Sequence, residues 1–225
     1  MKNILLIMLL ATVFACSEAP EQKDTKGFEQ DTSQQQAVVA VPWEEGTHYV
    51  VLDQEATENP EIKEFFSFYC PHCYSLEPFV AEIKKRFGER IPVDKVHVDF
   101  LGVTNREIQQ QVSMAMILAR QIGKEEQINQ AIFNHLHVQR KALDTPEQLI
   151  TLMATNGIEE QEFKAAIADA TVSKLIENHA QKFSTYRTDL TSVPTLVVNG
   201  KYKVMFGANS TPDDVLNLIE WLSKK

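Results

Sequence analysis

The sequence predicts one α/β domain that is interrupted by an all-helical insertion. A strand, a helix and another strand follow one another between residues 64 and 100, residues 104–186 show only helical patterns, and a strand hairpin with a helix closes the chain. The strand–helix–strand order is typical of a right-handed crossover unit. With 225 residues, 44% of them hydrophobic, the chain is long enough for a core and an insertion.

Residues 1–16 have the layout of a secretory signal peptide. Lys2 gives a basic start, an apolar run spans Ile4 to Leu10, and small residues lead through Ala15 to Cys16. This apolar run is too short to cross a membrane as a helix. The alternative to a signal peptide is a buried N-terminal helix. The last residues are similar to a bacterial lipoprotein cleavage site, so lipidation of Cys16 and ordinary cleavage nearby both stay open. In either case we expect the mature chain outside the cytoplasm.

Residues 17–40 are rich in Glu, Gln, Asp, Thr and Ser, which predicts a disordered linker. As a flexible coil this linker would reach roughly 25–30 Å, enough to hold a domain away from a membrane. The alternative is that residues 17–40 are an unstructured remnant of the leader with no role. The whole chain has 22 Lys and Arg against 31 Asp and Glu, a net charge of −9. This balance argues against a nucleic-acid partner, because phosphates demand a basic surface.

The α/β domain is expected to have two parts, residues 41–103 and 187–225. In the first part the patterns predict strands near 49–52, 64–69 and 93–100, and a helix over 74–87 that ends at Gly88. In the second part, Thr195–Val198 and Lys201–Val204 flank Asn199-Gly200, which is typical of a tight hairpin turn. A final helix is expected from Thr211 to Leu222.

The insertion is expected to cover residues 104–186. Helices are predicted near Arg106–Ile122 and Glu125–His137, after a capping box at Thr145, and over Glu160–Ala168 and Val172–Tyr186.

Cys70 and Cys73 remain as a pair once Cys16 is assigned to the export segment. A bridge across about four residues contributes only about 2 kcal/mol in the chain-entropy model, so it is better explained as chemistry than as a staple. Pro71 suits the first turn of a helix, whose free N–H groups favour a thiolate at Cys70. His72 favours it further when charged or donating a hydrogen bond. We therefore expect Cys70 to be the exposed nucleophile and Cys73 the resolving thiol one turn deeper.

A zinc site is the competing interpretation of this spacing, and it would need two more ligands. The remaining histidines include His135 and His137, which are two apart on a predicted helix and so point in different directions. Without a second cysteine pair, the sequence favours redox chemistry and no metal.

The segment Glu64-Phe65-Phe66-Ser67-Phe68-Tyr69-Cys70-Pro71-His72-Cys73-Tyr74 resembles the active-site segment of the DsbA family of periplasmic thiol–disulfide interchange proteins. The resemblance continues through Lys95-Val96-His97-Val98, the helical insertion, Val193-Pro194 and Val198–Tyr202. It implies a thioredoxin-like fold interrupted by an all-helical insertion domain. The acidic leader and the lipid anchor left open above depart from the usual soluble member.

The resemblance also implies a function and a set of site residues. The protein would donate its Cys70–Cys73 disulfide to reduced exported proteins, as a monomer in the periplasm and without another cofactor, and a DsbB-type membrane oxidase would reoxidise it. Pro194 would be a cis-proline facing Cys70, with Val193 beside the disulfide. Glu64 and Lys95 would manage the proton on Cys73, whereas the residues alone would equally fit a surface ion pair.

Two alternative functions stay open. One is a disulfide isomerase or reductase of the same superfamily, although isomerases carry an added dimerisation domain that the polar leader is too short to supply. The other is a binding or chaperone-like lipoprotein in which the disulfide is incidental.

Overall fold

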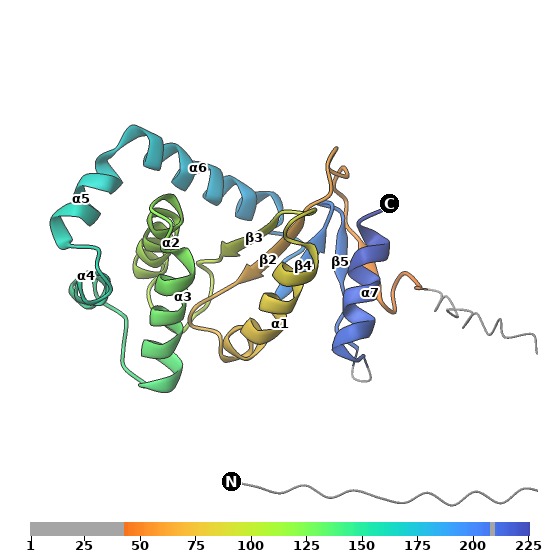
Figure 1. The fold of residues 1–225 in the computed structure, drawn as a ribbon, viewed down its shortest axis with the longest axis horizontal. Coiled ribbons are helices and arrows are strands. Elements are labelled where there is room, and N and C mark those ends of the chain that lie inside the picture. Colours follow the sequence, from red (N-terminus) through yellow and green to blue (C-terminus); the bar gives the residue numbers. More distant parts are fainter. Residues whose placement is uncertain (1–42, 208–209) are drawn as a thin grey trace, which may run out of the picture. The chain divides into compact units, whose positions relative to one another are not determined.

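The central feature of the computed structural model is a mixed sheet of five strands (Figure 1). The structure describes residues 43–207 and 210–225. The spatial order of the strands is β1-β5-β4-β2-β3. Their bounds are β1 Tyr49–Val51, β2 Ile62–Phe66, β3 Val93–His97, β4 Thr195–Val198 and β5 Tyr202–Val204.

Strands β2 and β3 are parallel and are joined by helix α1 (Pro71–Phe87). This is the predicted crossover unit, and its register places Glu64 opposite Lys95. Every residue of β2 is buried, as expected for a strand that is covered on both faces. On its other side β2 pairs antiparallel with β4, so the C-terminal hairpin completes the sheet next to the first crossover.

The hairpin between β4 and β5 turns at Asn199-Gly200, as predicted. Both residues have positive φ, 51° at Asn199 and 68° at Gly200, as at the two central positions of a type I′ turn, and the Lys201 N–H donates to the Val198 carbonyl oxygen at 3.1 Å. The last helix, α7 (Pro212–Leu222), starts with a capping box at Thr211. Helices α1 and α7 pack on one face of the sheet, where Ile83 and Phe87 meet the apolar side of α7.

Five α-helices and one π-helical turn lie between β3 and β4, which confirms the predicted all-helical insertion in an α/β fold. In Figure 1 they form the part of the chain on the left, and α6 returns to the sheet. Their bounds are α2 Arg106–Gln121, α3 Glu125–Phe133, α4 Pro146–Thr155, α5 Glu160–Ala168 and α6 Ala170–Thr185. The insertion and the sheet lie within one compact unit, Pro42–Lys225. The expected domain boundaries themselves stay predictions.

Three predicted elements differ from the structure. The strand expected over 64–69 is Ile62–Phe66, because the chain turns at Phe68 and Tyr69 toward α1. The strand expected over 93–100 ends at His97, which lies opposite Phe66, the last residue of its partner. The helix expected over 125–137 is α-helical only to Phe133 and continues as a π-helical turn, Asn134–Val138.

The cysteine pair is part of the larger core that the insertion builds. Phe66, Phe68 and both cysteines pack in one cluster with residues of α2, α3, α4 and α5. Helix α6 covers the opposite face of the sheet, where Phe183 and the following Tyr186 contact Phe65 and its neighbours. The helices of the insertion therefore set the surroundings of both thiols.

Within the described residues, no helix combines the length and the apolar character needed to cross a membrane. The predicted signal peptide, the linker over residues 17–40 and Cys16 lie outside the described residues.

Candidate active site

Cys70 is the N-cap residue of helix α1 and Pro71 is its first residue. The Cys70 sulfur accepts a hydrogen bond from the backbone N–H of Cys73 at 3.3 Å, as a capping side chain does. Both cysteines are free thiols in this structure. The local sequence explains the geometry, because proline suits the first turn and leaves the cap position to the cysteine. The helix N-terminus therefore points its free N–H groups at the sulfur of Cys70.

The two thiols differ in burial. Cys73 is fully buried, whereas Cys70 retains 7% of its surface. Burial raises the pKa of the Cys73 thiol, and the adjacent Cys70 and Glu64 act in the same direction. The expectation that Cys70 is exposed is wrong in degree: it is the more accessible thiol, but the surrounding core covers most of it. The asymmetry keeps Cys73 protonated and leaves Cys70 as the sulfur that a partner can reach.

His72 is exposed on the first turn of α1. Its side chain makes no hydrogen bond with any residue that the structure describes, so the structure shows none of the hydrogen bonding that the sequence suggested. Pro71 is exposed as well. The face of the motif that is open to solvent is thus formed by these two residues, beside the slightly accessible sulfur of Cys70.

The Val193–Pro194 pair lies against Cys70, as the family resemblance implied. Its peptide bond is cis. The Cys70 thiol donates to the carbonyl oxygen of Val193 at 3.5 Å. Pro194 directly precedes β4, so the sheet fixes the backbone that faces the sulfur. Residues more than 120 positions apart in the sequence thus meet at one sulfur atom.

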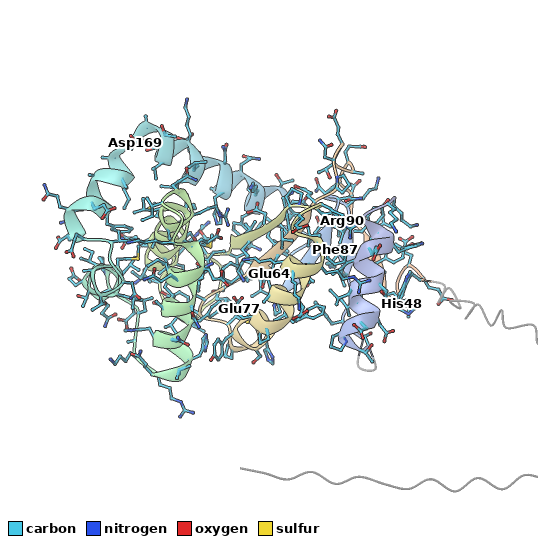
Figure 2. All side chains as sticks on the ribbon, in the orientation of Figure 1. His48, Glu64, Glu77, Phe87, Arg90 and Asp169 are labelled. Carbon is cyan, nitrogen blue, oxygen red and sulfur yellow. The ribbon has the colours of Figure 1, made fainter. Side chains whose placement is uncertain are left out.

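Glu64 and Lys95 form a buried ion pair beneath the motif. Lys95 Nζ donates to Glu64 Oε2 at 2.7 Å, and the two side chains are 2% and 0% exposed. These values rule out the surface ion pair that the residues alone would have fitted. A third member comes from helix α1, since Lys95 Nζ also donates to Glu77 Oε1 at 2.5 Å. Figure 2 labels both carboxylates, Glu64 on β2 and Glu77 on α1.

One ammonium group therefore serves two carboxylates that differ in burial. Burial raises the pKa of Glu64, although the charge of Lys95 opposes the shift. Burial alone would lower the pKa of Lys95, but Glu64 and Glu77 together raise it. Glu77 is 30% exposed and is therefore in contact with water, unlike Glu64. Glu64 Oε1 has no hydrogen-bond partner among the described residues, so Glu64 is the member of this group best suited to hold a proton.

Sequence reasoning missed Glu77. Its signal was its position four residues after Cys73, which places both on one face of a helix whose first turn carries the motif.

Sequence reasoning also missed a polar chain behind the motif. Ser67 accepts from the backbone N–H of Cys70 through its carbonyl at 3.1 Å and from the backbone N–H of Tyr69 through its hydroxyl at 3.2 Å. The same hydroxyl lies 3.4 Å from His97 Nε2, and His97 Nδ1 lies 2.7 Å from the Ser113 hydroxyl. Burial lowers the pKa of His97, so the ring is neutral at pH 7. Through the Ser67 hydroxyl, His97 supports the segment that carries Cys70.

His137, on the π-helical turn, contacts one residue before the Cys70–Cys73 motif and one residue after it. Its Nε2 lies 2.7 Å from the carbonyl oxygen of Phe68, and its ring stacks on Tyr74 with centroids 5.1 Å apart and an angle of 11°. Phe68 precedes the motif and Tyr74 follows it. His135, by contrast, bonds the carbonyl of Ala142, so the two histidines have different partners as the sequence indicated. Among the described residues no group of three or more His, Cys, Asp or Glu side chains is placed to hold a metal ion.

Comparison with known proteins shows which protein family this chain resembles. The family model that describes the DSBA-like thioredoxin domain matches residues 61–219 of this chain. The chain is 33% identical over 168 residues to the thiol:disulfide interchange protein DsbA of Pectobacterium carotovorum subsp. carotovorum, which covers 73% of this chain and 78% of that protein.

Solved structures agree with the sequence comparison. The crystal structure of the disulfide oxidoreductase DsbA from Proteus mirabilis superposes with a TM-score of 0.69 at 25% identity, covering 81% of this chain and 98% of that one. A cysteine-to-serine variant of the same protein with the non-covalently bound peptide PWATCDS has a TM-score of 0.66 at 26% identity, covering 81% and 99%.

The fold and the site define a thiol:disulfide oxidoreductase with a thioredoxin-like fold, in which Cys70 and Cys73 begin the first helix after a buried strand. The chain belongs to the family of DSBA-like thioredoxin domains.

Proposed function

We propose that this protein is a periplasmic dithiol oxidase that donates the Cys70–Cys73 disulfide to exported proteins during oxidative folding. The observation that carries the proposal is the placement of the Cys70 sulfur at the N-cap of α1, where it accepts from the Cys73 N–H, while Cys73 is fully buried. A thiolate is stabilised at such a helix start and not in a buried apolar site. Stabilising the reduced pair in this way favours giving the disulfide away.

The reaction follows from this asymmetry. In the oxidised protein a substrate thiolate attacks the Cys70 sulfur, a substrate–Cys70 disulfide forms, and the Cys70–Cys73 bond breaks. The electron pair leaves on Cys73, which takes up a proton because its thiol is favoured in the buried site. A second substrate thiolate then attacks the substrate sulfur and releases Cys70 as a thiolate. The substrate is oxidised by two electrons and the cysteine pair is reduced.

We assign supporting roles to four residues. The charge of Glu64, which is paired with Lys95, raises the pKa of the Cys73 thiol. We assign to this pair the supply and uptake of the Cys73 proton, because burial raises the pKa of the Glu64 carboxyl as well. The backbone at Val193 and Pro194 faces Cys70 and lines up an extended substrate strand beside the sulfur. The peptide complex of the Proteus mirabilis relative supports this, since that protein binds a short cysteine-containing peptide without a covalent bond.

The proposal is tested with the oxidised protein and reduced, unfolded ribonuclease A. We expect ribonuclease activity to return faster in the presence of the protein, and Cys70→Ser to abolish the acceleration. If Cys70→Ser remains as active as the parent, the proposed function fails. Activity of any kind that survives replacement of both Cys70 and Cys73 would instead support the binding-module alternative.

The same assay separates an oxidase from an isomerase. An oxidase shows weak rescue of ribonuclease with scrambled disulfides and is monomeric by light scattering, whereas a dimer with strong rescue would reverse the assignment. We also propose a DsbB-type membrane oxidase as the protein that reoxidises the pair. Export and lipidation are tested by fractionating cells that express the parent and Cys16→Ser, since only a lipidated parent would be retained by the membrane through that residue.

A further inference from the structure

A cavity of about 410 Å³ lies apart from the cysteine pair, between helices α2 and α6 and beside the end of strand β3. Figure 1 shows α6 running back over α2 toward the sheet. Neither cysteine of the pair lines the cavity, and neither does Val193 or Pro194. Its volume falls in the range of pockets that hold small molecules. Nothing in the proposed oxidase chemistry uses it.

One part of this cavity is apolar, and its charged lining residues are Asp99, Arg106 and Arg187. Met114 and Ile117 from α2 face Ile176 and Phe183 from α6 across it. The rings of His97 and His179 also line it, and burial lowers the pKa of both, so neither is charged at pH 7. An occupant must therefore carry an apolar body in this part of the cavity.

The guanidinium groups of two arginines also line the cavity, and only one of them is paired with a carboxylate. Arg106 donates from Nε to Asp99 Oδ2 at 2.8 Å, so its charge is matched by a carboxylate. Arg187 makes no ion pair or side-chain hydrogen bond with any residue that the structure describes. Its guanidinium lies 5.0 Å from the ring centroid of Phe100 and 5.8 Å from that of Phe183. The cavity therefore has one unmatched positive charge.

The position of Arg187 is favourable for binding an anion. The rings of Phe100 and Phe183 stack on each other with centroids 5.7 Å apart, and the guanidinium lies over this pair. This contact with the rings uses none of the guanidinium N–H donors, and a carboxylate matches their fork.

We propose that this cavity is a binding site for small monocarboxylates with an apolar body about the size of two fused aromatic rings. The carboxylate pairs with Arg187, and the apolar body lies between Met114 of α2 and Ile176 of α6. A single negative charge is specified because Arg106 is already matched by Asp99. The site is separate from the cysteine pair, so its occupancy can be measured without any redox reaction.

The probe is naphthalene-2-carboxylate, titrated into the reduced protein and followed by amide chemical shifts. We expect saturable binding with shifts centred on α2 and α6. The uncharged naphthalene-2-carboxamide should bind at least fivefold more weakly. Arg187→Gln should weaken binding of the carboxylate to the level of the amide and leave the amide unaffected.

A matched control is Arg86→Gln, because Arg86 also lies over a phenylalanine ring, 5.6 Å from the centroid of Phe87, but is paired with Glu220. It should leave both affinities unchanged. Ile176→Trp should fill the cavity and abolish binding of both probes. The proposal is overturned by non-saturable binding, by shifts centred on Cys70 and Pro194, or by unchanged affinity for the carboxylate in Arg187→Gln, a substitution of an exposed side chain that leaves the core intact.

Discussion

At the scale of single residues, the two sulfurs of the motif have opposite surroundings although only two residues separate them. Cys70 receives an N–H group at the helix start, and Cys73 is closed off by the core that the insertion builds. The sequence is sufficient to predict which sulfur caps the helix, because proline follows it directly. It is not sufficient to predict that Cys70 is only 7% exposed, because that burial depends on Val193 and on helices far away in the sequence.

This asymmetry predicts selective alkylation. In the reduced, folded protein at pH 7, iodoacetamide should modify Cys70 more than ~10-fold faster than Cys73, since each unit by which burial raises the pKa of Cys73 lowers its thiolate fraction tenfold. Peptide mapping by mass spectrometry at short times measures the two rates. The same protein in urea, where burial is lost, should label both sites alike. Equal labelling of the folded protein would contradict the described site.

The buried ion pair predicts a difference between two substitutions. Glu64→Gln keeps the shape of the side chain and leaves Lys95 paired with Glu77, so the free energy of unfolding should change by about 1 kcal/mol or less. Lys95→Met leaves a buried carboxylate without its partner and should cost about 3–5 kcal/mol. Denaturant titration of the reduced protein measures both values. If both variants lose the same free energy of unfolding, the loss comes from breaking the Glu64–Lys95 pair and not from leaving a buried carboxylate without a partner.

The pH dependence of the Glu64→Gln comparison has a definite sign. Folding raises the pKa of Glu64 above its ordinary value of 4.5, so the folded state binds more protons above that pH. Its contribution to stability is therefore greatest in acid and is lost as the pH rises from 4.5 through the raised pKa. The difference between parent and Glu64→Gln should move in the variant's favour across this window. A difference that is constant between pH 4 and pH 8 would contradict the raised pKa.

At the scale of elements, local signals predicted most starts and turns. The capping box at Thr145, the helix start at Thr211 and the Asn199-Gly200 turn depend on a few adjacent residues, and all three are present. The ends of β3 and α3 were predicted less well. β3 ends where its partner β2 ends, and no residue near the end of β3 in the sequence indicates that position. The change from α-helix to π-helix after Phe133 occurs in a stretch with no glycine or proline to announce it.

The π-helical turn predicts a contribution from His137 to stability at the motif. His137→Ala removes both the bond to the Phe68 carbonyl and the stacking on Tyr74, so unfolding should become easier by about 1–2 kcal/mol. His137→Gln retains a donor but not the ring, and it should recover about half of the loss. Denaturant titration gives these values. His135→Ala is the matched control on the same turn, since the His135 ring bonds the carbonyl oxygen of Ala142, outside the motif.

At the scale of the whole molecule, the site is assembled from segments that the sequence keeps far apart. The sequence predicted the strands and the insertion as separate elements, but their spatial order, β1-β5-β4-β2-β3, is set by tertiary packing. That order places β4 beside β2 and thereby brings Val193 to Cys70. The same packing joins α6 to the hairpin, where the hydroxyl of Tyr186 donates to the carbonyl oxygen of Gly200 at 2.9 Å. The redox pair is thus part of one cooperative structure.

If the pair belongs to that cooperative structure, its redox state must change the stability of the whole. The helix N-terminus, which favours a negative charge at its N-cap, exists only in the folded protein. Closing a loop of about four residues lowers the entropy of the unfolded chain by the equivalent of only about 2 kcal/mol. By the thermodynamic cycle, an oxidase must be more stable as the dithiol than as the disulfide, by about 1.4 kcal/mol for each tenfold gain in oxidising power over an unfolded pair.

Guanidinium titrations of the oxidised and reduced forms at pH 7 measure this difference directly. We expect a single transition for each form and a higher midpoint for the dithiol. A disulfide form that is more stable at pH 7 would make the protein a reductase, and two separate transitions would show that the insertion folds independently of the sheet.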